Sequence, residues 1–101
     1  MAKKKIEIVW SSEASYSFVE ILDYLSSKST SAVDIVGNSI LDEIENLSKN
    51  PFVHPTDRFK KKGNYNFRAC IVYSYRISYY VTDTEIHILR IRHTSREPLE
   101  F

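Results

Sequence analysis

Three short runs in the second half of the chain combine strand-forming residues with short intervening turns. Residues 65–73 are rich in aromatic and β-branched side chains, residues 75–81 alternate with a period of two, and residues 85–93 follow a Thr-Asp-Thr turn. A period of two is typical of strands with one buried face, and short connections join antiparallel neighbours. The second half therefore predicts an antiparallel three-stranded sheet.

The first half combines one strand pattern with two helical patterns. Residues 5–10 alternate apolar and polar side chains and predict a strand. A helix is predicted from a cap at Ser11-Ser12 to the serine-rich stretch 26–30, because its apolar residues recur every three or four positions. A second helix is predicted from about Ser31 and ends before Pro51. Two helices joined by a short turn form an antiparallel pair.

The predicted elements follow the order β-α-α-β-β-β, which belongs to the α+β class. We expect an antiparallel sheet with the two-helix hairpin packed on one face. A length of 101 residues is enough for one core, so residues 1–101 are predicted to form a single domain. Residues 52–64, which contain Pro55 and Gly63, are predicted to form a loop.

Basic charge is concentrated in the second half of the chain. Residues 1–50 hold five Lys/Arg and eight Asp/Glu, a net charge of −3, whereas residues 51–101 hold nine and five, a net charge of +4. This asymmetry favours an anionic partner, either nucleic acid or an acidic protein segment, and the alternative is a solvated basic face. Arg68 and Arg76 lie between apolar neighbours on predicted strands, so we expect both to point away from the core.

The sequence lacks the residues that several kinds of functional site require. His54, His87 and His93 are too far apart in sequence to give a metal-site spacing, and only two glycines occur. Cys70 is the single cysteine and lies in an apolar strand, so we interpret it as a buried structural thiol. No apolar run approaches the roughly 20 residues that span a bilayer. We expect a cytosolic protein without a metal or cofactor.

The residues best suited to chemistry are Arg76, His93 and Arg96. A histidine can act as a general acid or base near neutral pH, and arginines can stabilise the charge that builds on a phosphate during RNA cleavage. These three are candidate catalytic residues of a ribonuclease. The same side chains could instead hold an acidic peptide or a phosphate backbone. Further candidates for such binding are Arg68, Arg90, Arg92, Lys60, Lys61 and Lys62.

Four segments carry recognisable motifs in a fixed order. Residues 10–25 contain Trp-Ser-Ser-Glu-Ala and Ile-Leu-Asp-Tyr-Leu, and residues 44–51 read Ile-Glu-Asn-Leu-Ser-Lys-Asn-Pro. Residues 75–79 read Tyr-Arg-Ile-Ser-Tyr, and residues 88–98 read Ile-Leu-Arg-Ile-Arg-His-Thr-Ser-Arg-Glu-Pro. Over nearly its whole length the chain resembles the RelE/ParE toxin superfamily of type II toxin–antitoxin systems, and its terminal pattern resembles ParE.

The resemblance implies an intracellular toxin of a plasmid-stabilisation system that is neutralised by a cognate antitoxin. We expect either a homodimer or a hetero-oligomer with the antitoxin. ParE-type members poison DNA gyrase, and RelE-type members cut mRNA on the ribosome. RelE-type enzymes use lysines for cleavage, and the positions that resemble them in this chain hold Asn64 and Asn66. RNA-cleaving relatives often carry a tyrosine near the C-terminus, where this chain has Thr94 and Phe101. We therefore expect action on gyrase. The alternatives are a ribosome-dependent mRNA endonuclease and a non-toxic relative that only binds its antitoxin.

The antitoxin is expected to contribute an extended or helical segment with apolar anchors and acidic residues. Such a segment would meet the basic second half of the toxin, as disordered segments do when they fold on binding. Reversing the charge of Arg76 or Arg90 should then weaken the complex more than reversing the charge of Lys28.

Overall fold

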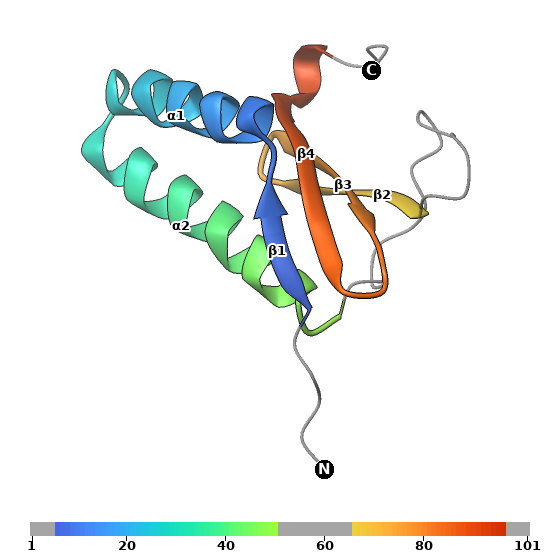
Figure 1. The fold of residues 1–101 in the computed structure, drawn as a ribbon. Coiled ribbons are helices and arrows are strands. Elements are labelled where there is room, and N and C mark those ends of the chain that lie inside the picture. The colour runs from blue at the N-terminus through green and yellow to red at the C-terminus, as the bar shows by residue number, and fades with distance from the viewer. Residues whose placement is uncertain (1–5, 51–65, 97–101) are drawn as a thin grey trace.

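The computed structural model describes residues 6–50 and 66–96 (Figure 1). Their α+β fold has the predicted order β-α-α-β-β-β, and the predicted loop at 52–64 lies outside the described residues. The elements are β1 (Glu7–Trp10), α1 (Ser12–Ser26), α2 (Thr30–Leu47), β2 (Asn66–Val72), β3 (Tyr75–Val81), β4 (Glu85–His93) and the 3-10 turn η1 (Thr94–Arg96).

Serine hydroxyl groups cap the start of both helices. Ser11 Oγ accepts the backbone N–H of Ala14 at 2.9 Å, and Ser29 Oγ accepts that of Ala32 at 3.0 Å. Each hydroxyl satisfies a helical N–H that has no partner within the helix. The first cap is where the sequence predicts it, whereas α2 begins at Thr30, one residue before the predicted start, because Ser29 supplies the cap.

The four strands form one sheet in the order β1-β4-β3-β2. β2 pairs with β3, and β3 pairs with β4, in the predicted antiparallel manner. β1 runs parallel to β4, so the expectation of an antiparallel sheet is wrong for this one pair. That expectation rested on short connections, and both helices and two strands separate β1 from β4 in the sequence.

Both helices lie on one side of the sheet and bury one of its faces (Figure 1). Gly37 allows the helices to pack closely, because a Cβ atom there would lie 3.1 Å from Leu22 Cδ2. We call the opposite side of the sheet the open face. The core includes Ile21, Leu25, Ile40, Ile44, Leu47, Ile77, Tyr79, Ile86, Ile88 and Ile91.

A β-bulge in β4 changes which side chains reach the open face. The β3–β4 pairing passes from Tyr79–Ile88 to Ser78–Arg90, which leaves Leu89 as the extra residue. Directly paired residues of antiparallel strands point to the same face, so one extra residue reverses the alternation of β4 beyond that point. The bulge thereby sends the arginines of β4 to the open face while the isoleucines on both sides of it stay in the core.

Over residues 6–50 and 66–96, neither helix combines the length and apolar character that a membrane crossing requires.

Candidate functional site

Three arginines form a cluster on the open face where β3 begins and β4 ends. Arg76 is directly opposite Arg92, and Arg90 is directly opposite Ser78. Arg76 is only 8% exposed, and its Nη1 atom donates to Ser78 Oγ at 3.2 Å. Like charges directly opposite each other on neighbouring strands repel, so this arrangement favours an anionic group close by. We call Arg76, Arg90 and Arg92 the arginine cluster.

An ion pair ties the arginine cluster to the first turn of α1. Arg90 Nη2 lies 2.6 Å from Glu13 Oε2, and the Glu13 side chain is about half exposed. Exposed pairs of this kind contribute little to stability, but a short contact between two elements restricts where the arginine points. Glu13 therefore helps to orient Arg90 at the edge of β4 that β1 does not cover.

An open groove of about 670 Å³ lies between α1 and the end of β4. Its α1 wall carries Tyr16, which is 67% exposed, and Tyr24, which is 56% exposed. Large exposed aromatic side chains are common anchors at protein interfaces. We call this cavity the α1–β4 groove. Its acidic and aromatic wall is formed by Glu13, Tyr16, Ser17, Glu20 and Tyr24, and its cationic wall by Arg90 and Arg92. The lining is completed by Ile21, Tyr75, Ile91, His93 and Ser95.

His93 belongs to this groove and is held by two neighbours. Its ring meets that of Tyr75 edge to face, with 5.3 Å between the ring centroids. Its Nδ1 atom accepts the backbone N–H of Ser95 at 3.1 Å and lies 2.9 Å from the Ser95 hydroxyl. Because a backbone N–H can only donate, the neutral ring carries its proton on Nε2. In this tautomer Nε2 of the neutral ring can donate a hydrogen bond but cannot accept one.

Two of the three residues that were predicted to form a ribonuclease site, Arg76 and His93, come from opposite faces of the sheet. His93 pairs with Tyr75, a core residue on the helix side, whereas Arg76 pairs with Arg92 on the open face. Neighbouring residues of a strand point to opposite faces, so Arg76 and His93 lie on opposite sides of the sheet. The backbone of Arg96 lies in η1, and Lys60, Lys61 and Lys62 lie outside the described residues.

Arg68 does not join the arginine cluster, and the expectation that it points away from the core is wrong. It is directly opposite Tyr79, a fully buried residue on the helix side of the sheet. Burial raises the pKa of the Tyr79 hydroxyl well above its ordinary value, and the positive charge of Arg68 partly opposes this rise. Arg76 does lie on the open face, as predicted.

Cys70 lies in the core, as predicted. Burial raises the pKa of its thiol to about 12, with the charge of Glu43 adding to the rise and that of Arg76 opposing it. A nucleophilic cysteine needs a thiolate near neutral pH, so Cys70 is unsuited to catalysis. Within residues 6–50 and 66–96, no group of three His, Cys, Asp or Glu side chains is arranged to hold a metal ion.

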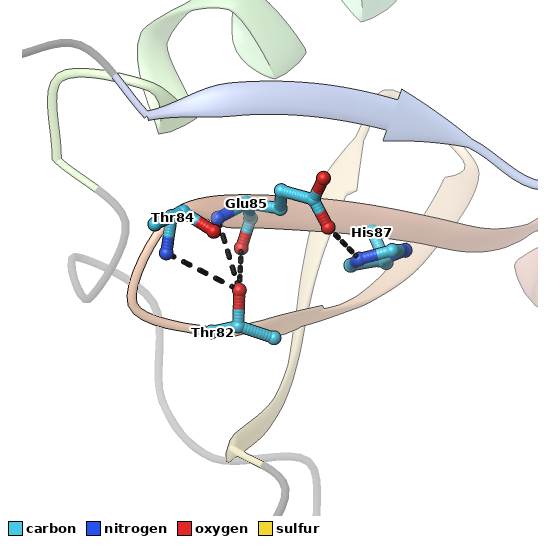
Figure 2. Close-up of polar contacts among 4 residues, drawn as sticks. All are labelled: Thr82, Thr84, Glu85 and His87. Atoms are coloured by element: carbon cyan, nitrogen blue, oxygen red, sulfur yellow. Dashed lines mark hydrogen bonds and ion pairs between the residues drawn. The ribbon is translucent and has the colours of Figure 1, made fainter.

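An aromatic stack occupies the other end of the open face and was not predicted as a feature of the surface. The rings of Tyr80 and His87 are parallel with centroids 4.6 Å apart, and Phe67 meets Tyr80 edge to face at 5.6 Å. His87 Nε2 lies 2.8 Å from Glu85 Oε1, as Figure 2 shows. In the adjoining turn, Thr82 Oγ1 accepts the backbone N–H of Glu85 at 2.9 Å. These contacts fix the β3–β4 hairpin.

The groove residues of α1 are the main functional candidates that the sequence reasoning missed. Tyr16 and Tyr24 are eight positions apart, with Glu20 between them, and all three lie beside the apolar stripe of the helix. Residues four apart on a helix share a face, so two aromatics at this spacing off the buried stripe are a readable sign of an exposed aromatic surface.

One comparison with known proteins identifies a family. The family model described as the ParE toxin of the type II toxin–antitoxin system parDE matches residues 8–98. No curated protein sequence matches the chain.

Two solved structures share the fold. One is described as a chromosomal ParDE TA system from P. aeruginosa, with a TM-score of 0.59, 19% identity, and coverage of 88% of this chain and 96% of that chain. The other is an archaeal RelE–RelB complex from Pyrococcus horikoshii OT3, with a TM-score of 0.64, 16% identity, and coverage of 93% and 100%. Both identities are low, so these structures support the fold, and the family model supports the assignment. The chain therefore belongs to the ParE toxin family of type II toxin–antitoxin systems.

Proposed function

We propose that this toxin acts in the cytosol by binding DNA gyrase through its arginine cluster, and that it does not cleave RNA. The observation that supports binding over cleavage is the separation of Arg76 and His93 on opposite faces of the sheet. Catalytic groups must converge on one reacting centre to lower a barrier.

The chemistry of the arginine cluster fits an anionic surface on the target. Guanidinium groups form paired hydrogen bonds with carboxylates and phosphates, and they also steer the encounter of two proteins. Replacing Arg92 should therefore weaken binding with little effect on the fold, because Arg92 is only partly buried and lies on the face that the helices leave uncovered.

The partner that neutralises the toxin is proposed to be an antitoxin segment in the α1–β4 groove. The walls of the groove carry opposite charges, and Tyr16 and Tyr24 supply exposed aromatic surface. The fitting segment has an apolar anchor over Ile91, acidic residues beside the cationic wall and basic residues beside Glu20. Because Arg90 and Arg92 line the groove, an antitoxin bound there would also occupy the residues proposed to contact gyrase.

Supercoiling by purified gyrase tests the target. The wild-type toxin should inhibit supercoiling or trap cleaved DNA, and Arg92→Glu should inhibit at least about tenfold less, which corresponds to about 1.4 kcal/mol. Lys28→Glu is the matched control, because it reverses a charge in the α1–α2 turn and should leave inhibition unchanged. Absence of inhibition at excess toxin contradicts the proposal.

Two further assays separate the alternatives. Toeprinting of translating ribosomes should show no new mRNA ends, and ends that depend on toxin would identify an mRNA endonuclease instead. Expression of the toxin without antitoxin should arrest growth. Unaffected growth would favour a relative that only binds its antitoxin.

A further inference from the structure

Ser11 makes three hydrogen bonds, of which two reach the bulge of β4 and one caps α1. Its backbone N–H donates to the carbonyl of Ile88 at 2.9 Å. Its hydroxyl donates to the carbonyl of Leu89 at 2.9 Å and accepts the backbone N–H of Ala14 at 2.9 Å. One residue therefore caps a helix and donates hydrogen bonds to two consecutive carbonyl groups of a neighbouring strand.

The bulge leaves two consecutive carbonyl groups of β4, those of Ile88 and Leu89, that need hydrogen-bond donors on the same side of the strand. In a regular strand, successive carbonyls point toward opposite neighbouring strands. The Ile88 and Leu89 carbonyls instead both reach Ser11, and β1 has already ended at Trp10. A partly buried carbonyl without a donor costs free energy, so the Ser11 hydroxyl stabilises the bulge at this position.

A hydroxyl group is well suited to this double role. It carries one donor hydrogen and two acceptor lone pairs, so it can serve Leu89 and Ala14 together. An aspartate could cap α1 but, when ionised, could not donate to a carbonyl, and an alanine could do neither. A threonine keeps both functions. These differences separate the capping role from the role at the bulge.

We propose that Ser11 is a positioning residue that holds the bulge at Leu89 and thereby fixes Arg90 and Arg92 on the open face. A change of one residue in strand register moves every following side chain to the other face. If the extra residue moved along β4, Arg90 would exchange faces with its neighbours. The ion pair between Glu13 and Arg90, also from the first turn of α1, reinforces the same arrangement.

Four variants isolate this role. Ser11→Ala removes the cap and the bond to Leu89, whereas Ser11→Asp keeps the cap, removes that bond and places a negative charge beside the Leu89 carbonyl. Ser11→Thr should behave as the wild type. Ser29→Ala is the matched control, because Ser29 caps α2 through Ala32 in the same way and lies in the α1–α2 turn. It should lose stability like Ser11→Ala without affecting β4.

The first readout is the register of β4, measured by NMR on the purified toxin. Nuclear Overhauser contacts between Ser78 and Arg90 and the exchange rates of amides 89–92 report on the bulge directly. Ser11→Ala and Ser11→Asp should weaken the Ser78–Arg90 contacts and accelerate exchange by up to about tenfold, the effect of losing one partly buried hydrogen bond. Ser29→Ala and Ser11→Thr should change neither. Unchanged contacts and exchange rates in Ser11→Asp would overturn the proposal.

The second readout is inhibition of gyrase, and this part rests on the proposed function. Ser11→Asp should inhibit about tenfold less than Ser29→Ala, although its cap is intact. Equal inhibition by the two variants, with the register of Ser11→Asp altered, would overturn the link between Ser11 and binding while leaving gyrase as the target. If the wild type itself does not inhibit gyrase, the proposed target fails, and the register measurement alone decides the role of Ser11.

Discussion

Replacing either of the two exposed tyrosines of α1, Tyr16 and Tyr24, with alanine should weaken antitoxin binding. The expected loss of binding free energy follows from the surface area that each side chain can bury in the complex. A tyrosine presents about 200 Å² of surface, so the 67% exposed Tyr16 can lose about 130 Å² on full burial. At about 25 cal/mol per Å², this burial contributes at most about 3 kcal/mol. Ordering of the side chain and imperfect burial reduce that figure to about 1–2 kcal/mol. Tyr16→Ala should therefore raise the Kd about 5–30-fold, and Tyr24→Ala should have a similar effect.

Isothermal titration calorimetry with the cognate antitoxin measures this effect. Tyr73→Ala is the control, because Tyr73 is 62% exposed but lies in the β2–β3 turn outside the groove. The control should bind as tightly as the wild type. Wild-type affinity in both α1 variants, or an equal loss in Tyr73→Ala, would refute the placement of the antitoxin in the α1–β4 groove.

Three further predictions concern the fold that supports the site. Glu13→Gln should lower the free energy of unfolding by about 0.5 kcal/mol at low salt and by less at high salt, in urea titrations, because it breaks an exposed ion pair. Burial raises the pKa of the Cys70 thiol from 9.0 to about 12 in the folded state, so above pH 9.0 the thiol ionises more readily in the unfolded chain. Its contribution to the free energy of unfolding is therefore complete below pH 9.0 and is lost as the pH rises toward about 12. Denaturation across that range should show a smaller loss of stability in Cys70→Ala than in the wild type, and an equal loss would contradict the cause given. Gly37→Val should lower stability by about 1–3 kcal/mol in thermal unfolding, because even a Cβ atom there would lie 3.1 Å from Leu22 Cδ2, and unchanged stability would show that the helices can separate freely.

The strand and helix pattern could be predicted because its signals are local. The alternation of residues 75–81 and the turn after them define β3 and the start of β4 without tertiary information. The cap at Ser11 is likewise a local signal, since a serine before an apolar helical stripe satisfies the first free N–H groups.

The orientation of the arginines could not be read so directly. β2 carries apolar residues at consecutive positions from Ala69 to Val72, so its alternation does not show which face Arg68 occupies. The direction of β1 is also a tertiary property, because it depends on how both helices return the chain to the sheet.

The bulge at Leu89 could not be predicted from the sequence for a related reason. Apolar residues at positions 86, 88, 89 and 91 fit no single period of two, and the sequence does not say which of them is the extra one. Only the pairing with β3, and the two bonds from Ser11, identify Leu89 and place Arg90 and Arg92 on the open face. The site therefore depends on a contact between residues that are 78 positions apart.

The central claim is that this toxin binds gyrase and uses no histidine-based chemistry. A supercoiling assay that compares wild type, Arg92→Ala and His93→Ala at matched concentrations tests it most directly. The account predicts inhibition by wild type and by His93→Ala within about threefold of each other, and at least about tenfold weaker inhibition by Arg92→Ala. No inhibition by the wild type, or loss of inhibition in His93→Ala with Arg92→Ala unaffected, would contradict it.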